Sequence, residues 1–211
     1  MAALGPRRAV AELGQAHQAR GSAAAARYGD LAIKARASFC GRFIRADGEG
    51  LADVVDTPNG DDLSVRPNQI FAVSLPFPLL EQREQRAVVN AVGRSLLTSY
   101  GLRSLSPDDP AYRGNFTGDS FRRDSGYHQG PVWTWPIGGF AEAHYWAYGD
   151  RQTALGFLRP FEYHLRDGGL GNISEVLEGD PPHLPKGCIA QAWGVAEVLR
   201  VWRLLQDQSV D

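Results

Sequence analysis

The sequence has few cysteines and no excess of charge of either sign. It contains 2 cysteines, Cys40 and Cys188, which lie far apart, so a disulfide framework is excluded and a reducing compartment is expected. The 22 Lys and Arg residues almost balance the 24 Asp and Glu residues, which leaves a net charge of −2. Nucleic-acid binding requires a basic excess or stripe, and an anionic membrane surface also attracts basic segments. We therefore expect neither nucleic acid nor membrane as a partner.

Long apolar runs are also absent from the sequence. No uncharged stretch approaches the roughly 20 residues that span a bilayer, and the Ala-rich residues 1–30 are interrupted by arginines. These residues lack the apolar core and the cleavage site of a secretory signal. The absences predict a cytoplasmic protein.

The spacings of common metal and cofactor sites are missing as well. His128, His183 and Cys188 do not have zinc-ligand spacing, and the Asp-rich stretch 53–62 does not match a calcium loop. The Gly-rich stretch 168–171 follows a predicted helix rather than a strand, so it is not a dinucleotide-binding fingerprint. No metal ion or cofactor is expected. Cys188 has no evident histidine partner and is expected to be a buried structural residue.

Strand patterns are scarce, because no apolar–polar alternation lasts more than four residues, whereas helical patterns recur. Helices are predicted over residues 6–19, 22–44, 67–73, 81–98, 136–149, 151–166 and 188–205. The very short link Gly149-Asp150 implies an antiparallel helical hairpin. The pattern predicts an all-α fold of about seven helices with long loops gathered on one face.

Two of these helices have an apolar stripe, which predicts the face that each one buries. In 81–98 the stripe consists of Val88, Val92, Leu96 and Leu97. In 188–205 it consists of Trp193, Ala196 and Trp202, with Leu199 or the stem of Arg200. Both stripes are expected to pack against neighbouring helices.

The loop over 168–187 carries three carboxylates, Glu175, Glu178 and Asp180, within six positions. Carboxylates that are held close together and partly shielded have their pKa values pushed apart, which is the placement that a general base needs. A solvated acidic loop is the more common explanation of such a run. Apolar neighbours such as Ile173 and Leu177 favour an anchored loop instead.

The loop over 99–135 ends in a cluster of hydrogen-bonding and aromatic side chains. Its members are Asp124, Tyr127, His128, Gln129, Trp133 and Trp135. A sugar needs both kinds of contact, since polar groups bind its hydroxyls and flat rings cover its C–H surfaces, and Trp offers a large apolar face with one N–H donor. Either tryptophan alone fits a core position at a helix start, whereas the cluster as a whole favours a binding surface.

A third polar group surrounds the start of the helix predicted over 67–73. Arg66 has a planar guanidinium suited to a carboxylate or to vicinal hydroxyls, and Asn68 and Gln69 follow it closely. Asp62 or Ser64 can cap the helix, which is a structural role. A structural and a binding role fit this segment equally well.

At these loops the sequence resembles a known family. The matching segments are 53–76, 96–119, 127–140 and 173–200, and the likeness is collinear from about residue 10 to 205. They resemble the C-terminal glucosidase domain of glycogen debranching enzymes, the amylo-α-1,6-glucosidase type. The resemblance implies an (α/α)6 toroid with the active site in loops at one end. Residues 1–211 would then be a single C-terminal portion of that toroid.

The resemblance also implies an activity and a set of site residues. The activity is hydrolysis, with inversion, of the α-1,6-linked glucose left at a trimmed branch point of glycogen or limit dextrin. Glu175, in an Ile-Ser-Glu motif, would be the general base, and Glu178 and Asp180 match the acidic positions after it. Sugar contacts would come from Arg66, Asn68, Gln69, Tyr127, His128, Gln129 and Trp133. The expected partner is therefore a branched α-glucan.

The chain departs from the family pattern in three places. The family has Thr-Val-Trp-Pro-Trp where residues 131–135 read Pro-Val-Trp-Thr-Trp, which changes the dihedral restraints of this loop. Ile44 stands where an aromatic residue is usual. The family's general acid lies in a Thr-Trp-Met-Asp motif that this sequence does not contain. Loss of a general acid costs about 10²–10⁴ in rate, so the chain alone is expected to be a poor or inactive glycosidase.

Other interpretations stay open. A second chain could supply the part of the toroid that carries the acid, and the open edges of a partial toroid would favour self-association unless a partner covers them. The protein could also be a non-catalytic α-glucan-binding or scaffold protein. A further alternative is another (α/α)6 glycosidase, of glucoamylase or trehalase type.

Overall fold

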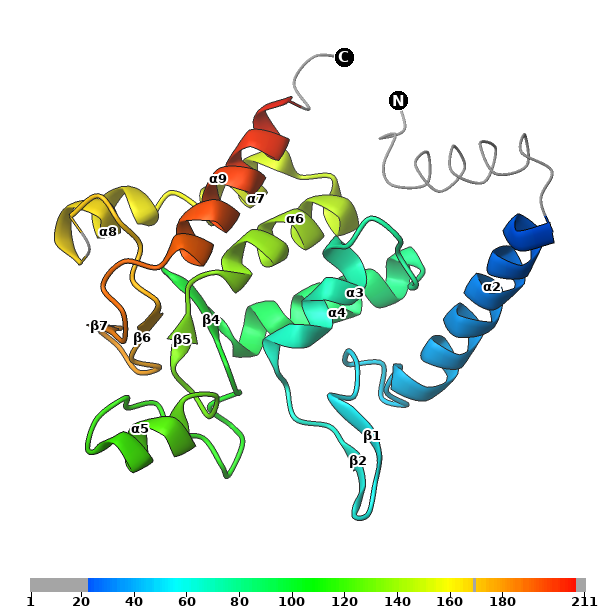
Figure 1. Ribbon diagram of the computed structural model, residues 1–211, viewed down its shortest axis with the longest axis horizontal. Coiled ribbons are helices and arrows are strands. Elements are labelled where there is room, and N and C mark those ends of the chain that lie inside the picture. The colour runs from blue at the N-terminus through cyan, green and yellow to red at the C-terminus, as the bar shows by residue number, and fades with distance from the viewer. Residues whose placement is uncertain (1–22, 169, 208–211) are drawn as a thin grey trace.

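The computed structural model describes residues 23–168 and 170–207. Helices dominate this part of the chain, as the sequence predicts (Figure 1). They are α2 (Ala23–Phe43), α3 (Phe71–Ser74), α4 (Gln82–Ser95), α5 (Ser120–Gly126), α6 (Pro136–Tyr148), α7 (Arg151–Gly156), α8 (Phe161–Asp167) and α9 (Ala192–Asp207), with a 3₁₀ helix at Pro67–Ile70. The helix predicted over 6–19 lies outside the described residues.

Helix α6 is the centre of a helical layer. It packs against α9, α3, α4 and α7, and Figure 1 shows it running between α9 and the α3–α4 pair. Ile137, Ala141 and Ala143 are fully buried, as expected of a helix that is apolar on most sides. The helix begins at Pro136, whose missing N–H is not needed in the first turn. It ends at Gly149 in a left-handed conformation.

The prediction of an all-α fold is incomplete, because a small antiparallel sheet lies beside the helical layer. Its strands, in sheet order, are β3 (Leu97–Thr98), β4 (Gly101–Arg103), β5 (Val132–Trp133), β6 (Val176–Leu177) and β7 (Pro185–Lys186). A separate hairpin joins β1 (Val54–Thr57) and β2 (Gly60–Asp62). Strands this short show no alternation in the sequence. The pairing of β5 with β6 brings the two long loops together.

Three predicted helices have different boundaries in the structure. The helix predicted over 81–98 ends at Ser95, because Leu97 and Thr98 form β3. The helix predicted over 151–166 is divided into α7 and α8, because Pro160 lacks the N–H that a continuous helix needs at this position. The last helix begins at Ala192 rather than at residue 188. The backbone N–H groups of Cys188 and Gln191 are bonded instead to Glu175 and to Ile173.

The two predicted buried faces have different outcomes. Of the stripe predicted over 81–98, Val88, Val92 and Leu96 are fully buried, which confirms these three positions, whereas Leu97 lies in β3 and is only partly buried. In α9 the prediction is wrong, because Trp193 and Trp202 are 51% and 50% exposed. The buried residues of α9 are Gly194, Val201 and Leu205. Because Gly194 has no Cβ, this side of α9 can lie against Thr134. A Cβ at this position would lie 2.8 Å from the Thr134 hydroxyl oxygen.

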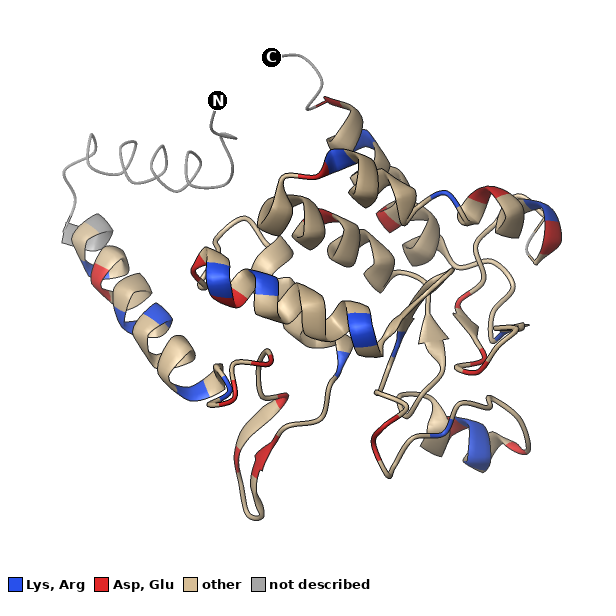
Figure 2. Ribbon diagram, turned by 180° about the vertical axis from the view of Figure 1, so that it is seen from behind, with Lys and Arg blue, Asp and Glu red and all other residues tan. Residues whose placement is uncertain are grey.

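The described helices do not include one that is long and apolar enough to cross a bilayer. Basic and acidic residues are interspersed over the helices, as along α2 and across the helical layer (Figure 2). The closed toroid, and the placement of residues 1–211 within one portion of it, stay predictions.

Candidate active site

Glu175 lies where the loop over 168–187 enters the sheet, directly before β6. Its backbone N–H donates to the Cys188 carbonyl at 2.9 Å, and its carbonyl accepts from the Thr134 N–H at 3.3 Å. The carboxylate accepts a hydrogen bond from the Cys188 N–H on Oε2 at 3.0 Å and from the Gln191 amide on Oε1 at 3.3 Å. The segment that leads into α9 therefore orients both carboxylate oxygens.

Gly187 gives this carboxylate room. Its φ is +63°, and a Cβ at this position would lie 2.6 Å from Glu175 Oε2 and 2.9 Å from Val176 Cγ2. The positive φ and the close approach both favour glycine. The chain can therefore fold back over Glu175 and present the next backbone N–H to it.

The residue before Glu175 is anchored in the core. Ser174 is buried, its N–H donates to His164 Nε2 at 3.1 Å, and its carbonyl accepts from the Thr134 hydroxyl at 2.8 Å. A ring nitrogen that accepts this bond belongs to a neutral imidazole protonated at Nδ1. Burial lowers the pKa of His164, against an opposing effect of the Asp167 charge. Burial therefore favours the neutral ring that this bond requires.

An aromatic cluster formed by Tyr127, His128 and Trp133 borders Glu175. Burial, and then a hydrogen bond with Glu175, raises the pKa of Tyr127, so this phenol stays protonated and donates to the carboxylate. The Tyr127 and Trp133 ring centroids are 4.7 Å apart, and His128 stacks on Trp133 at 5.2 Å with an angle of 7°. Trp133 Nε1 donates to the Tyr127 carbonyl at 3.1 Å. The cluster supplies one hydroxyl and a set of flat rings next to Glu175.

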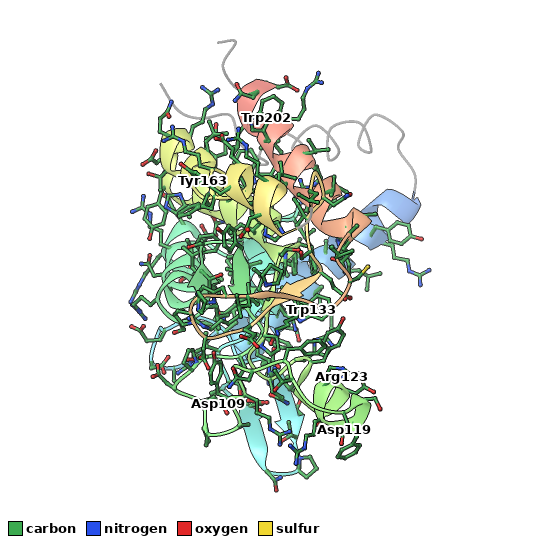
Figure 3. All side chains as sticks on the ribbon, turned by 90° about the vertical axis from the view of Figure 1, so that its left-hand side faces the viewer. Asp109, Asp119, Arg123, Trp133, Tyr163 and Trp202 are labelled. Atoms are coloured by element: carbon green, nitrogen blue, oxygen red, sulfur yellow. The ribbon has the colours of Figure 1, made fainter. Side chains whose placement is uncertain are left out.

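A cavity of about 290 Å³ opens beside this cluster. Its lining includes Arg66, Asn68, His128, Trp133, Trp135 and Trp193. The last two indoles stack with ring centroids 3.9 Å apart and an angle of 13°. Figure 3 shows Trp133 between the helical layer, where Trp202 is labelled, and α5, where Arg123 is labelled. Aromatic walls with a few polar groups at the rim suit a sugar.

Comparisons with known proteins identify the family. The sequence profile of the family described as "Amylo-alpha-1,6-glucosidase" matches residues 3–200. The chain belongs to this family. The glycogen debranching enzyme of Saccharomyces cerevisiae is 30% identical over 89 residues, which cover 39% of this chain and 6% of that enzyme. The chain therefore matches only a small part of this relative's length.

Arg66, which the resemblance to amylo-alpha-1,6-glucosidases assigns to sugar contact, bonds mainly within the chain. Nη1 donates to the carbonyls of His128 at 2.7 Å and Ser104 at 3.2 Å, and Nη2 donates to Gln129 Oε1 at 3.0 Å. Nε lies 3.5 Å from Asp53 Oδ2. Arg66 and Gln129 thus hold the loop over 99–135 in place at the rim of the cavity.

Gln69 and Asn68 have different surroundings in the structure. Gln69 is buried, with Oε1 accepting from the Leu51 N–H at 3.2 Å and Nε2 donating to the Arg66 carbonyl at 3.2 Å. Asn68 is exposed and lines the cavity. Burial raises the pKa of Asp53, while the Arg66 charge and a hydrogen bond from Asn68 oppose this rise.

Glu178 and Asp180, like Glu175, are not among the residues that line the cavity. Glu178 Oε1 lies 3.4 Å from Lys186 Nζ, and Asp180 accepts from the Tyr112 hydroxyl at 2.9 Å. Burial, followed by the Asp180 bond, raises the pKa of Tyr112 to about 12. Asp124 is exposed on α5, and its charge helps to raise the pKa of the tyrosine in the aromatic cluster.

Sequence reasoning missed His164, Gln191 and Trp193. The latter two lie in the family-like segment 173–200, which was the available signal, but Trp193 was assigned to the core. Cys188 is exposed rather than buried as predicted, and it contributes its backbone N–H. Within residues 23–168 and 170–207, no group of three or more His, Cys, Asp or Glu side chains could hold a metal ion.

Proposed function

We propose that the cavity lined by His128 and Trp133 binds the terminal glucose of a branched α-glucan, such as glycogen or limit dextrin, and that Glu175, which neighbours this aromatic cluster through Tyr127, is the general base of an inverting hydrolysis. One observation carries the proposal. The Glu175 carboxylate is oriented by donors from Cys188, Gln191 and Tyr127 beside a wall of aromatic rings. Membership of the amylo-alpha-1,6-glucosidase family supports this class of substrate.

In this reaction a water oxygen attacks C1 of the glucose while the water proton passes to Glu175. The bond from C1 to the glucan oxygen breaks, and the configuration at C1 inverts. A carboxylate that is already oriented lowers the entropic cost of placing the water and the base. Because Tyr127 stays protonated, it donates to Glu175 and does not compete for the water proton. The His128–Trp133 pair covers the C–H face of the sugar.

The proton for the leaving oxygen must come from a general acid. By the resemblance, that acid lies in a Thr-Trp-Met-Asp motif, which this sequence does not contain. We therefore expect the 211-residue chain by itself to hydrolyse natural glucans about 10²–10⁴ times more slowly than a site that has its acid. A second chain that supplies the acid, and a cytoplasmic location, stay predictions.

α-Glucosyl fluoride tests the base separately from the acid, because fluoride leaves carbon without needing a proton. Water adds to C1, Glu175 takes the proton, and the C–F bond breaks to give β-glucose and fluoride. We expect fluoride release, followed with a fluoride electrode, to fall about 10²–10⁴-fold in Glu175→Gln. Glu162→Gln, at an exposed position of α8, is the matched control.

Three outcomes would contradict parts of this proposal. An unchanged rate in Glu175→Gln would remove Glu175 from the mechanism. α-Glucose as the first product, seen by proton NMR, would exclude inversion. Rapid glucose release from limit dextrin by the chain alone would show that the general acid is present after all.

A second candidate function is non-catalytic binding of α-glucan. The observations that favour it are the aromatic cavity and the absence of the Thr-Trp-Met-Asp motif. Such a protein would bind limit dextrin and release no fluoride from α-glucosyl fluoride, so the same assay separates the two functions.

A further inference from the structure

We propose that the chain has a second glucan subsite, a cavity that shares the Trp135–Trp193 stack with the first and holds a further glucosyl unit of the same α-glucan. This inference rests on the proposed function. The second cavity has a volume of about 230 Å³, and its lining includes Phe71, Trp135, Glu142, Trp193, Glu197 and Arg200. Because both tryptophans also line the first cavity, one oligosaccharide can contact both.

Three stacked aromatic rings, contributed by α3, by the residue before α6 and by α9, form one wall of the second cavity. The Phe71 and Trp135 centroids are 5.5 Å apart at 9°, and Trp135 and Trp193 are 3.9 Å apart at 13°. Phe71 belongs to α3, Trp135 precedes α6, and Trp193 lies in the first turn of α9. About half of Trp193 stays exposed, at 51%. A flat indole that is fixed by stacking and open to solvent suits the C–H face of a glucosyl ring.

The polar side of the second cavity is an ionic group of Arg200, Glu197 and Glu142. Arg200 Nε and Nη2 donate to Glu197 at 3.0 and 2.9 Å, and Nη2 lies 2.8 Å from Glu142 Oε2. Glu142 is buried and also accepts from Trp146 Nε1 at 3.4 Å. A guanidinium has five N–H donors and a carboxylate has about four acceptor positions. The contacts above leave some of these donors and acceptors unused. Sugar hydroxyls, which donate and accept, can use the remainder.

The charges of this group restrict the class of ligand. Two carboxylates and one guanidinium leave an excess of negative charge, which disfavours an anionic ligand such as a sugar phosphate. A neutral ligand with many hydroxyls and flat apolar faces fits both the ionic group and the indoles. Under the proposed function, that ligand is the continuing glucan chain.

Gly138 and Gly139 of α6 let the walls of this cavity come together. A Cβ at Gly138 would lie 2.6 Å from Glu197 Oε2 and 3.0 Å from Glu197 Cβ, and one at Gly139 would lie 3.0 Å from the Phe71 ring. Helices α9 and α3 therefore approach α6 closely and bring Glu197 and Phe71 to one site. A cavity built by packed helices is preorganised, which lowers the entropic cost of binding.

Two tryptophans of α9 provide a matched test. Trp193 and Trp202 are 51% and 50% exposed, and Trp193 lines both cavities whereas Trp202 lines neither. We expect the affinity of the full chain for maltohexaose, measured by titration calorimetry, to fall about 10-fold or more in Trp193→Ala. In Trp202→Ala it should stay within about twofold of the wild type.

Glu197→Gln tests the second cavity without changing the shared indoles. We expect it to reduce the gain in affinity from maltose to maltohexaose by about fivefold, with Glu162→Gln as the control. Circular dichroism checks that each variant is folded, and if Trp193→Ala is not, Glu197→Gln decides the question.

The outcomes separate the subsite from the proposed function. Wild-type affinity for maltohexaose in both Trp193→Ala and Glu197→Gln overturns the subsite, as does an equal loss in Trp202→Ala. A wild-type chain that releases fluoride from α-glucosyl fluoride but binds maltohexaose no more tightly than glucose also overturns the subsite, and it leaves the proposed function standing. A chain with no affinity for any α-glucan overturns both.

Discussion

Glu175 is held by residues from segments that are far apart in the chain. Tyr127 follows α5, Cys188 and Gln191 precede α9, and His164 on α8 holds the neighbouring Ser174. Donors fixed from several directions leave the carboxylate few alternative orientations. A change at one of these positions should therefore affect Glu175 even when it leaves the fold intact.

His164 should make this arrangement sensitive to acid. Its Nε2 accepts the Ser174 N–H, burial lowers its pKa, the Asp167 charge opposes this shift, and the Tyr100 ring packs against it. Because the pKa in the folded chain lies below the unfolded value of about 6.5, the folded state binds fewer protons. Its stability should be highest above that value and fall as the pH drops below it. The dependence of Tm on pH, measured by thermal unfolding with circular dichroism from neutral to mildly acidic pH, tests this expectation.

The variant His164→Gln provides the comparison, because its amide oxygen can accept the Ser174 N–H but does not titrate. We expect a flatter dependence of Tm on pH in the variant. Part of the slope should remain, because burial also lowers the pKa of His144. Equal slopes in the two proteins would show that His164 does not contribute.

The identity of the polar residues near the site could be predicted from the sequence, but their bonding could not. Arg66 has the fork that vicinal hydroxyls need, yet it bonds to the carbonyls of Ser104 and His128. These partners lie far along the chain, so no local pattern shows them. The same holds for the Cys188 N–H, which is a backbone group that every residue but proline carries.

Among the helices and strands, predictability followed the strength of the local pattern. Helix α4 has a strict apolar stripe, and its start and most of its buried face were predicted, whereas its end was placed at residue 98 rather than at Ser95. Strands β3 to β7 have two or three residues each and owe their existence to pairing between distant segments. The buried face of α9 was misplaced because Gly194 and Val201, rather than the two large indoles, pack inward. The close approach of two backbones at a glycine depends on tertiary packing, so the spacing of hydrophobic residues does not predict it.

Gly138 offers a test of how tightly α6 and α9 pack. In Gly138→Ala the new Cβ would lie 3.0 Å from Glu197 Cβ and 3.1 Å from the Glu197 carbonyl oxygen. We expect a loss of about 1–3 kcal/mol in the free energy of unfolding, measured with urea. Gly41→Ala is the control, since apart from the local backbone of α2 nothing lies within 4 Å of its Cβ position, and its free energy of unfolding should rise by up to about 1 kcal/mol. Equal effects at both sites would contradict the close packing.

Across the whole described structure, α2 and α9 carry large apolar side chains that are exposed. Figure 1 shows α2 standing apart from the helical layer, at the side opposite to α8. Leu31 and Ile33 on α2 are 48% and 71% exposed, and Leu199 and Trp202 on α9 are 58% and 50% exposed. Monomers rarely expose large contiguous apolar patches without a function for them. These exposed side chains on the two helices favour association.

We therefore expect the 211-residue chain to self-associate as its concentration rises, because each contact removes apolar surface from water at roughly 25 cal/mol per Å². Sedimentation velocity over a range of concentrations measures this. The double variant Ile33→Lys and Leu199→Lys places a charge on each helix and should shift the equilibrium toward the monomer. Tyr163→Lys, at a position of α8 that is 71% exposed, should not. A monomer at every concentration, or equal association in the double variant, would show that these exposed side chains do not drive assembly.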